Sequence, residues 1–248
     1  MSAINPEELL LAYRLGIFPM AESRNASEVL WVRPHERGII PLETFHVPRR
    51  LARAVKNDIF DVRIDTAFDR VIRGCAESRP DRRDTWINDP IIDVFETMYE
   101  RGHAHSVETW QDGELVGGLY GLSLGGAFFA ESKFSRMTDA SKVALVHLAA
   151  RLKAGGYGLL DAQFPNPHLD QFGAITVTEE RFQGLLAQAL EYDGDFYRLG
   201  RPGAAGSGSA SLGAIAGSAP GGNAGGTMGA GGGASAGWSV LQVITQTS

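Results

Sequence analysis

The stretch AHSVETWQDGELVGGLYGLSLGGAFFAESKFS, residues 104–135, decides the fold. It contains three runs typical of β-strands, separated by QDGE (111–114) and SLGG (123–126). Both separators carry the glycine that tight hairpin turns favour. We therefore expect an antiparallel meander of three strands in the middle of the chain.

The flanking sequence alternates between helical and strand patterns. Short strands are expected in residues 59–65 and 158–164, and two more around a proline-containing turn in residues 29–42. Asn5 and Asp139 are candidate N-caps, and Gly16 and the pair Gly155 and Gly156 are candidate stops. The apolar periodicity predicts helices over residues 5–16, 48–58, 66–78, 88–102, 139–156 and 179–192.

This order of elements predicts an α+β fold with a central, mostly antiparallel sheet flanked by helices. We expect a small N-terminal α/β domain over residues 1–60 and a second domain over residues 61–198. From residue 199 to residue 248 the chain is almost wholly Gly, Ala, Ser and Pro, with no charge after Arg201. Such a segment is expected to be a disordered tail, although its apolar end, WSVLQVITQTS, could form a short strand.

Composition limits the classes of protein that the chain can belong to. The 248 residues are 44% hydrophobic and 21% charged, as in globular chains. The single cysteine, Cys75, excludes an internal disulfide and multi-cysteine zinc sites, which favours a reducing compartment. The sequence has neither the pattern of a secretory signal nor an apolar run of about 18 residues, so we expect a cytoplasmic protein.

Positive charge is concentrated in one part of the chain. The net charge is −6, yet residues 33–83 hold 12 Arg or Lys against 8 Asp or Glu, a local excess of +4. Within this segment Arg49, Arg53 and Lys56 are spaced at i, i+4 and i+7, which places them on one face of a helix. This face is a candidate phosphate-binding surface, and scattered solvated charges are an equally good interpretation of the segment as a whole.

Several stretches together resemble a known family. The order of elements is similar to that of the acetyltransferase superfamily (GNAT) core. Between about residues 8 and 185, the signature stretches of the leucyl/phenylalanyl-tRNA–protein transferases are matched in order by LAYRLGIFPM (11–20), LWVRPHERGIIP (30–41), TWI (85–87), GHAHSVETWQDGELVGGLYG (102–121), ESKFSRMTDASKVAL (131–145) and LLDAQFPNPHLDQFGA (159–174).

The resemblance implies an enzyme that carries leucine or phenylalanine from aminoacyl-tRNA to the N-terminal Arg or Lys of an acceptor protein. This transfer marks the acceptor for N-end-rule degradation, and it implies neither a metal nor a coenzyme. We expect a monomer. The chain departs from the family pattern in starting without the usual N-terminal leader, in having Met20 where the family has the Trp of FPW, and in its glycine-rich tail.

The implied reaction is the attack of an α-amine on an activated ester. The pKa of a free α-amino group is about 7.7–8.0, so about a tenth of it is neutral at pH 7 and a strong base is unnecessary. By resemblance, Asp161 and Gln163 are the catalytic positions. Two residues apart on a strand, they share a face, with Asp161 polarising Gln163 or accepting the proton itself. A strand-end pair that bonds to a neighbouring loop is the structural alternative.

Glu131 has an unusual place directly after the apolar run AFFA. By resemblance it belongs to the binding site, where a carboxylate would pair with the cationic acceptor. An ion pair with Lys133 or Arg136 is the alternative. Strict alternation would put Phe128 and Glu131 on opposite faces of the strand, so placing both in the site requires a β-bulge or a splayed strand between them.

An apolar pocket for the leucyl or phenylalanyl side chain is also implied, and it should accept methionine partly. Leu148 and Leu152, at i and i+4 of a helix, would otherwise be ordinary core residues. The resemblance assigns to this pocket Trp86, Leu119, Phe128, Leu148, Leu152 and Leu160, with Asn166 lining the same site. It also assigns tRNA binding to Arg49, Arg53 and Lys56.

Three other functions were weighed against this interpretation. An acyl-coenzyme-A N-acyltransferase needs a glycine-containing phosphate cradle before the central helix, where this chain has FSRMTDASK (134–142) with no glycine. A non-enzymatic RNA-binding module would leave Asp161 and Gln163 without a purpose. His103 and His105 share a strand face, but no third ligand is spaced near them for a metal.

Overall fold

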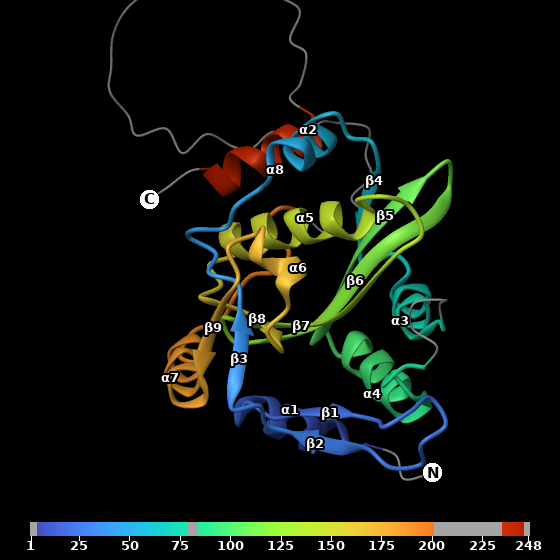
Figure 1. The fold of residues 1–248 in the computed structure, drawn as a ribbon, viewed down its shortest axis with the longest axis vertical. Coiled ribbons are helices and arrows are strands. Elements are labelled where there is room, and N and C mark those ends of the chain that lie inside the picture. Colours follow the sequence, from blue (N-terminus) through green and yellow to red (C-terminus); the bar gives the residue numbers. More distant parts are fainter. Residues whose placement is uncertain (1–3, 79–83, 201–234, 246–248) are drawn as a thin grey trace, which may run out of the picture.

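The fold is seen in a computed structural model that describes residues 4–78, 84–200 and 235–245 (Figure 1). Its centre is a seven-stranded sheet with the order β4-β5-β6-β7-β8-β3-β9. Neighbouring strands in this order are antiparallel, except for the parallel pair β7 and β8. The predicted α+β class with a mostly antiparallel sheet is confirmed.

The meander is the longest continuous part of the sheet. It consists of β5 (Ala104–Gln111), β6 (Glu114–Leu124) and β7 (Ala127–Ser135). The first hairpin turn places Asp112 and Gly113 at φ 51° and 80°. Two left-handed residues are what a two-residue hairpin needs, which explains why Asp-Gly occurs there.

Both faces of the sheet are covered by helices. One core cluster packs under α1 (Pro6–Arg14), α3 (Phe68–Ala76), α4 (Asp89–Glu100) and α7 (Glu179–Ala189). The other packs under α5 (Ala140–Ala154) and α2 (Arg49–Lys56). In Figure 1, α5 and α2 lie to the upper left of the diagonal strands β5 and β6, and α3 and α4 lie to their lower right. No helix within the described ranges combines the length and the apolar character that crossing a bilayer requires.

The predicted helix ends are confirmed with one exception. Asn5 accepts a hydrogen bond from the Glu7 amide at 2.8 Å, and Gly155 ends α5. Asp139 precedes α5 but makes no side-chain cap, so that prediction was wrong. Its carboxylate instead lies near Lys142 and Arg50, at 3.2 and 3.5 Å.

Three short elements were not predicted. They are β1 (Phe18–Met20), which pairs with β2 (Leu30–Val32) in a separate two-stranded sheet, α6 (Pro167–Asp170), and β9 (Ile175–Thr178). Runs of three or four residues carry too little periodicity to be recognised. The predicted strands β4 (Asp61–Ile64) and β8 (Leu159–Gln163) are present.

The domain boundary expected at residue 60 falls between two strands that belong to the same sheet. β3 (Glu36–Ile39) and β4 lie on opposite sides of it in the sequence and belong to the same seven strands. Most of the predicted tail, residues 201–234, lies outside the described residues. The apolar end of the chain is a helix, α8 (Ala236–Thr245), and the short strand expected there was wrong. Val240 and Ile244 of α8 are buried in the cluster beneath α2 and α5, because a helix offers its apolar face at i and i+4.

Candidate active site

The two strands at the centre of the sheet separate near their ends. β7 and β8 pair only from Ala127 to Phe129 and from Leu159 to Asp161. Beyond these residues, β8 continues to pair with β3 on its other side. Glu131 and Gln163 therefore lie where β7 and β8 no longer share backbone hydrogen bonds.

A β-bulge places Glu131 in this opening. Gly121 of β6 faces Ala130, and the next β6 residue towards the N-terminus, Tyr120, faces Ser132. Glu131 is thus the extra residue of β7, so a bulge is present here, as one of the two expected irregularities. Phe128 and Glu131 nevertheless face opposite sides of the sheet, because Phe128 is buried in the cluster under α5 and Glu131 contacts Tyr13 of the other cluster. Bulges re-aim side chains in this way at many active sites.

The Glu131 carboxylate is buried and accepts hydrogen bonds from two distant parts of the chain. The Tyr13 hydroxyl in α1 donates to Oε1 at 2.7 Å, and Gln163 Nε2 lies 3.0 Å from both oxygens. Among the described residues, Glu131 forms no ion pair with Lys133 or Arg136, the two alternatives. Arg136 donates to Glu77 at 2.6 Å, and Lys133 lines a hollow together with Lys142 and Leu145. Burial raises the pKa of Glu131 to about 7, against the lowering effect of the bonds from Tyr13 and Gln163.

Asp161 is fully buried and has different partners from those the sequence suggested. Arg37 donates to its two oxygens, from Nε at 2.9 Å and from Nη2 at 2.6 Å. Asp161 Oδ1 also accepts from the Gln163 backbone amide at 2.8 Å, so Asp161 contacts the backbone of Gln163. Burial raises the pKa of Asp161, and the ion pair with Arg37 opposes that shift.

Gln163 has an unusual backbone. Its φ is 64°, in the left-handed region that residues other than glycine rarely occupy. The register with β3 shifts here, so that Ala162 is an extra residue between Asp161 and Gln163. This turn of the chain sends Asp161 towards Arg37 and the Gln163 amide towards Glu131.

An apolar hollow lies beside the opening. Its volume is about 170 Å³, and it is lined by Lys133, Ser141, Lys142, Leu145, Asn166, His168 and Phe172. Leu145 and Phe172 belong to the core cluster under α5, together with five predicted pocket residues, Leu119, Phe128, Leu148, Leu152 and Leu160. These five are buried in that cluster and do not line the hollow, whereas Asn166 does. Trp86 packs against the opposite core cluster.

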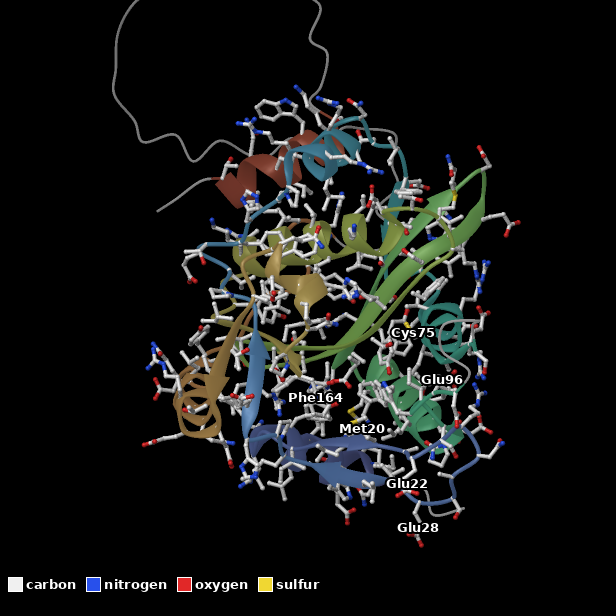
Figure 2. The ribbon with its side chains drawn as sticks, viewed as in Figure 1. Met20, Glu22, Glu28, Cys75, Glu96 and Phe164 are labelled. Atoms are coloured by element: carbon white, nitrogen blue, oxygen red, sulfur yellow. The ribbon has the colours of Figure 1, made fainter. Side chains whose placement is uncertain are left out.

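The N-terminal strands meet the end of β8 on the other side of the site. The rings of Phe18 and Phe164 form an edge contact with centroids 5.5 Å apart. Figure 2 shows Phe164, which is half-exposed, above Met20, the residue that replaces the family tryptophan.

The basic helix α2 presents its predicted face to solvent. Arg49, Arg53 and Lys56 are exposed, and Leu51 and Val55 anchor the opposite side. Within the described ranges, none of the three cations forms an ion pair.

The rest of the basic segment is largely engaged within the protein. Arg33, Arg63 and Arg73 pair with Glu179, Asp61 and Glu96, and Arg37 is buried. Arg79, Arg82 and Arg83 lie outside the described residues. Among the described residues of this segment, the exposed cations without an ion pair are therefore fewer than the charge count over residues 33–83 indicated.

His105, one of the two histidines, has a structural explanation. His105 Nδ1 lies 2.8 Å from Asp65 Oδ2, and its ring stacks on Phe196 with centroids 3.9 Å apart. His105 is a hydrogen-bonded core residue.

Two residues of the site were not predicted from the sequence. Tyr13 lies on the buried side of the first predicted helix, and Arg37 lies in a strand within the basic segment. Their signal was local. Tyr13 belongs to the stretch LAYRLGIFPM, and Arg37 is the cation directly before the apolar run GII.

Comparisons with known proteins indicate the family to which the chain is similar. The family model described as leucyl/phenylalanyl-tRNA protein transferase matches residues 39–187, and the model of the N-terminal domain of the same family matches residues 2–35.

Similar proteins bear the name leucyl/phenylalanyl-tRNA–protein transferase. One from Caulobacter vibrioides is 56% identical over 197 residues, which are 79% of this chain and 91% of that protein. One from Paramagnetospirillum magneticum is 57% identical over 190 residues, 77% and 91% of the two chains. One from Phenylobacterium zucineum is 54% identical over 217 residues, 87% and 98%.

Proposed function

This chain belongs to the leucyl/phenylalanyl-tRNA–protein transferase family and is an aminoacyltransferase, and we propose that it transfers leucine or phenylalanine, and less readily methionine, to acceptor proteins with N-terminal Arg or Lys. The donor is the aminoacyl-tRNA. We further propose that the transfer marks acceptors for N-end-rule degradation in the cytoplasm, and that the enzyme acts as a monomer.

The observation that carries this proposal is the contact between Gln163 and Glu131 across the opening of β7 and β8. An acceptor with a basic N-terminal residue brings two positive groups, the α-ammonium and the side chain. A carboxylate in a part-buried site binds such groups by charge-assisted hydrogen bonds. We assign acceptor binding to Glu131.

Proton removal falls to the same carboxylate in this proposal. The pKa of Glu131, about 7, is near that of an α-amino group, so a proton can pass between them at little cost in free energy. Asp161 is held by Arg37 and by the Gln163 backbone, which leaves Glu131 as the better acceptor. Gln163 orients the amine, and Asp161 fixes Gln163.

The donor is proposed to lie on the other side of the opening. The hollow of about 170 Å³ at Lys133, Leu145 and Phe172 is large enough for part of an apolar side chain. The buried leucines of the cluster under α5 form an apolar wall that would reject polar amino acids and separate similar apolar ones poorly. Arg49, Arg53 and Lys56 on α2 would contact tRNA phosphates, which position the donor without reading its sequence.

A transfer assay tests the proposal. Purified protein is mixed with tRNA charged with labelled leucine and with a reporter protein that begins with Arg. A reporter with an acetylated N-terminus is the control. We expect label only on the free amine, and only while the donor ester is intact. Label from deacylated tRNA mixtures, or acetylation from acetyl-coenzyme A, would contradict the proposal.

A further inference from the structure

Arg37 is a buried cation that pairs with Asp161. The residue is 1% exposed to solvent. Its hydrogen bonds within the described residues all go to buried groups of the protein. It cannot touch a substrate from there. Burying a charge costs free energy that only well-placed partners offset, so the groups that Arg37 contacts indicate its role.

The contacts of Arg37 define its orientation completely. Nε and Nη2 form the two-pronged pair with Asp161, and Nη1 donates to the Gly16 carbonyl at 2.9 Å. The guanidinium lies between two rings, 4.7 Å from the centroid of Phe18 and 4.3 Å from that of Phe182. Lysine has neither the planar fork nor the stacking surface for this place.

The next link runs from Asp161 to Gln163. The oxygen that accepts from Arg37 Nε also accepts from the Gln163 amide, so one atom joins the guanidinium to the strained backbone. A glutamine at φ 64° needs such support, because the left-handed conformation is unfavourable for it.

We propose that Arg37 is a positioning residue for the transfer reaction, which acts through Asp161 to hold Gln163 with its amide on Glu131. This inference rests on the proposed function of Glu131 and Gln163. This role differs from a general structural one. It predicts that the effect of replacing Arg37 on the transfer rate depends on the side chain of Gln163.

The strand that carries Arg37 supports this role. β3 lies between β8 and β9, and its first residues are beside α1 (Figure 1). Gly38, the neighbour of Arg37, faces Gln163 in the register, and a Cβ there would lie 2.7 Å from the Phe164 carbonyl oxygen. β3 therefore approaches the turn of β8 closely, with Arg37 and Gly38 fixing its two sides.

The experiment is a double-mutant cycle on the chemical step. Arg37→Lys is made in the wild type and in Gln163→Ala, and transfer is measured in single turnover at saturating donor and acceptor. Arg33→Met is the matched control. Arg33 precedes the same strand and donates to the Leu15 carbonyl at 3.3 Å, but it pairs with the partly exposed Glu179 and, among the described residues, makes no hydrogen bond or ion pair with Asp161.

We expect Arg37→Lys to slow single-turnover transfer by about 10- to 100-fold in the wild type, since small misplacements of reacting groups have effects of this size. The KM values should change little. In Gln163→Ala the same substitution should slow transfer by less than about threefold, because the linkage has already been lost. Arg33→Met should leave the rate near that of the wild type.

Equal losses in the two backgrounds would overturn the inference and leave Arg37 a purely structural residue. If Arg37→Lys does not fold, the neutral pair Arg37→Met with Asp161→Asn takes its place in the same cycle, with the same two outcomes. A wild-type protein that transfers no leucine would instead refute the proposed function, so the two failures are separate.

Discussion

Gln163 Nε2 lies 3.0 Å from both carboxylate oxygens of Glu131, although the two residues are on strands that have stopped pairing. Side chains thus bridge a gap that the backbone leaves open. The bridge depends on two irregularities, the bulge at Glu131 and the left-handed backbone of Gln163. Each irregularity costs free energy in the folded chain, which is typical of residues placed for function.

Glu131→Gln tests the role of the negative charge. The substitution keeps the shape of the side chain but removes the charge that would attract a basic acceptor. We expect the acceptor KM to rise by about tenfold or more, because hydrogen bonds to charged groups contribute about 1.5–3 kcal/mol. The affinity for tRNA, measured by filter binding, should not change. A variant that differs from the wild type only in melting temperature would reduce Glu131 to a structural residue.

The raised pKa of Glu131 predicts a pH dependence of stability. Its pKa moves from 4.5 to about 7 on folding, so the folded protein binds the proton more tightly. The contribution of Glu131 to the free energy of unfolding is therefore largest below pH 4.5. It declines as the pH rises to about 7. Relative to Glu131→Gln, the wild type should lose on the order of 3 kcal/mol over this range.

Denaturant titrations of both proteins between pH 4 and pH 8.5 would measure this difference. Tyr13→Phe is the control, because it removes one bond to the ionised form of Glu131 without changing the charge. Its transition should move to higher pH. A difference between wild type and Glu131→Gln that stays constant with pH would mean that the carboxylate is ionised throughout.

The basic face of α2 should determine the salt dependence of tRNA binding. Replacing Arg49, Arg53 and Lys56 together with Ala should reduce the slope of log affinity against log salt by up to about 2–3 units, since each phosphate contact contributes about 0.7–0.9. The matched control replaces Arg63, Arg73 and Arg101, which are part-exposed and already ion-paired. An identical slope for the α2 variant and the wild type would exclude these three residues from phosphate contact.

The terminal helix α8 should stabilise the fold. Val240 and Ile244 are buried against α2 and α5, and the Gly237 amide donates to Asp58 at 2.8 Å. Truncation after residue 234 is expected to lower the free energy of unfolding by about 2 kcal/mol, or roughly 4–8 °C in melting temperature. Ile244→Asp should reproduce much of this loss, and Gln242→Asp, on the exposed side, very little. Unchanged melting after truncation would show that α8 does not dock.

Most helices, strands and turns of this protein were predictable from the sequence, because they depend on local patterns of residues. The Asp-Gly hairpin and the Asn5 cap are decided by adjacent residues. A bulge beside Glu131 was also expected from the sequence, although Phe128 and Glu131 keep the opposite faces that regular alternation gives them.

The partners of the site residues depended on contacts that are distant in sequence. Arg37 and Asp161 are 124 residues apart, and the place of Arg37 before the apolar run GII does not indicate which residue it pairs with. The apolar spacing of Leu148 and Leu152 likewise fits a core helix and a pocket wall equally, and the structure places both in the core cluster under α5.

The last prediction separates the parts played by Asp161 and Gln163. Asp161→Ala would leave the Arg37 charge buried without its partner, which typically destabilises a protein by about 3–5 kcal/mol. Gln163→Ala removes a side chain that bonds only to Glu131 among the described residues, so its effect on stability should be about 1 kcal/mol. Its effect on single-turnover transfer should be near 100-fold, the lower end for a positioned group, because the ester is already activated. The double variant should lose less rate than the product of the single losses, because Asp161 acts through Gln163. Denaturant unfolding and single-turnover rates from pH 6 to pH 9, measured for all four proteins, would separate the role of Asp161 from that of Gln163. An Asp161→Ala protein of normal stability with the largest loss of rate would show instead that Asp161 takes the proton itself.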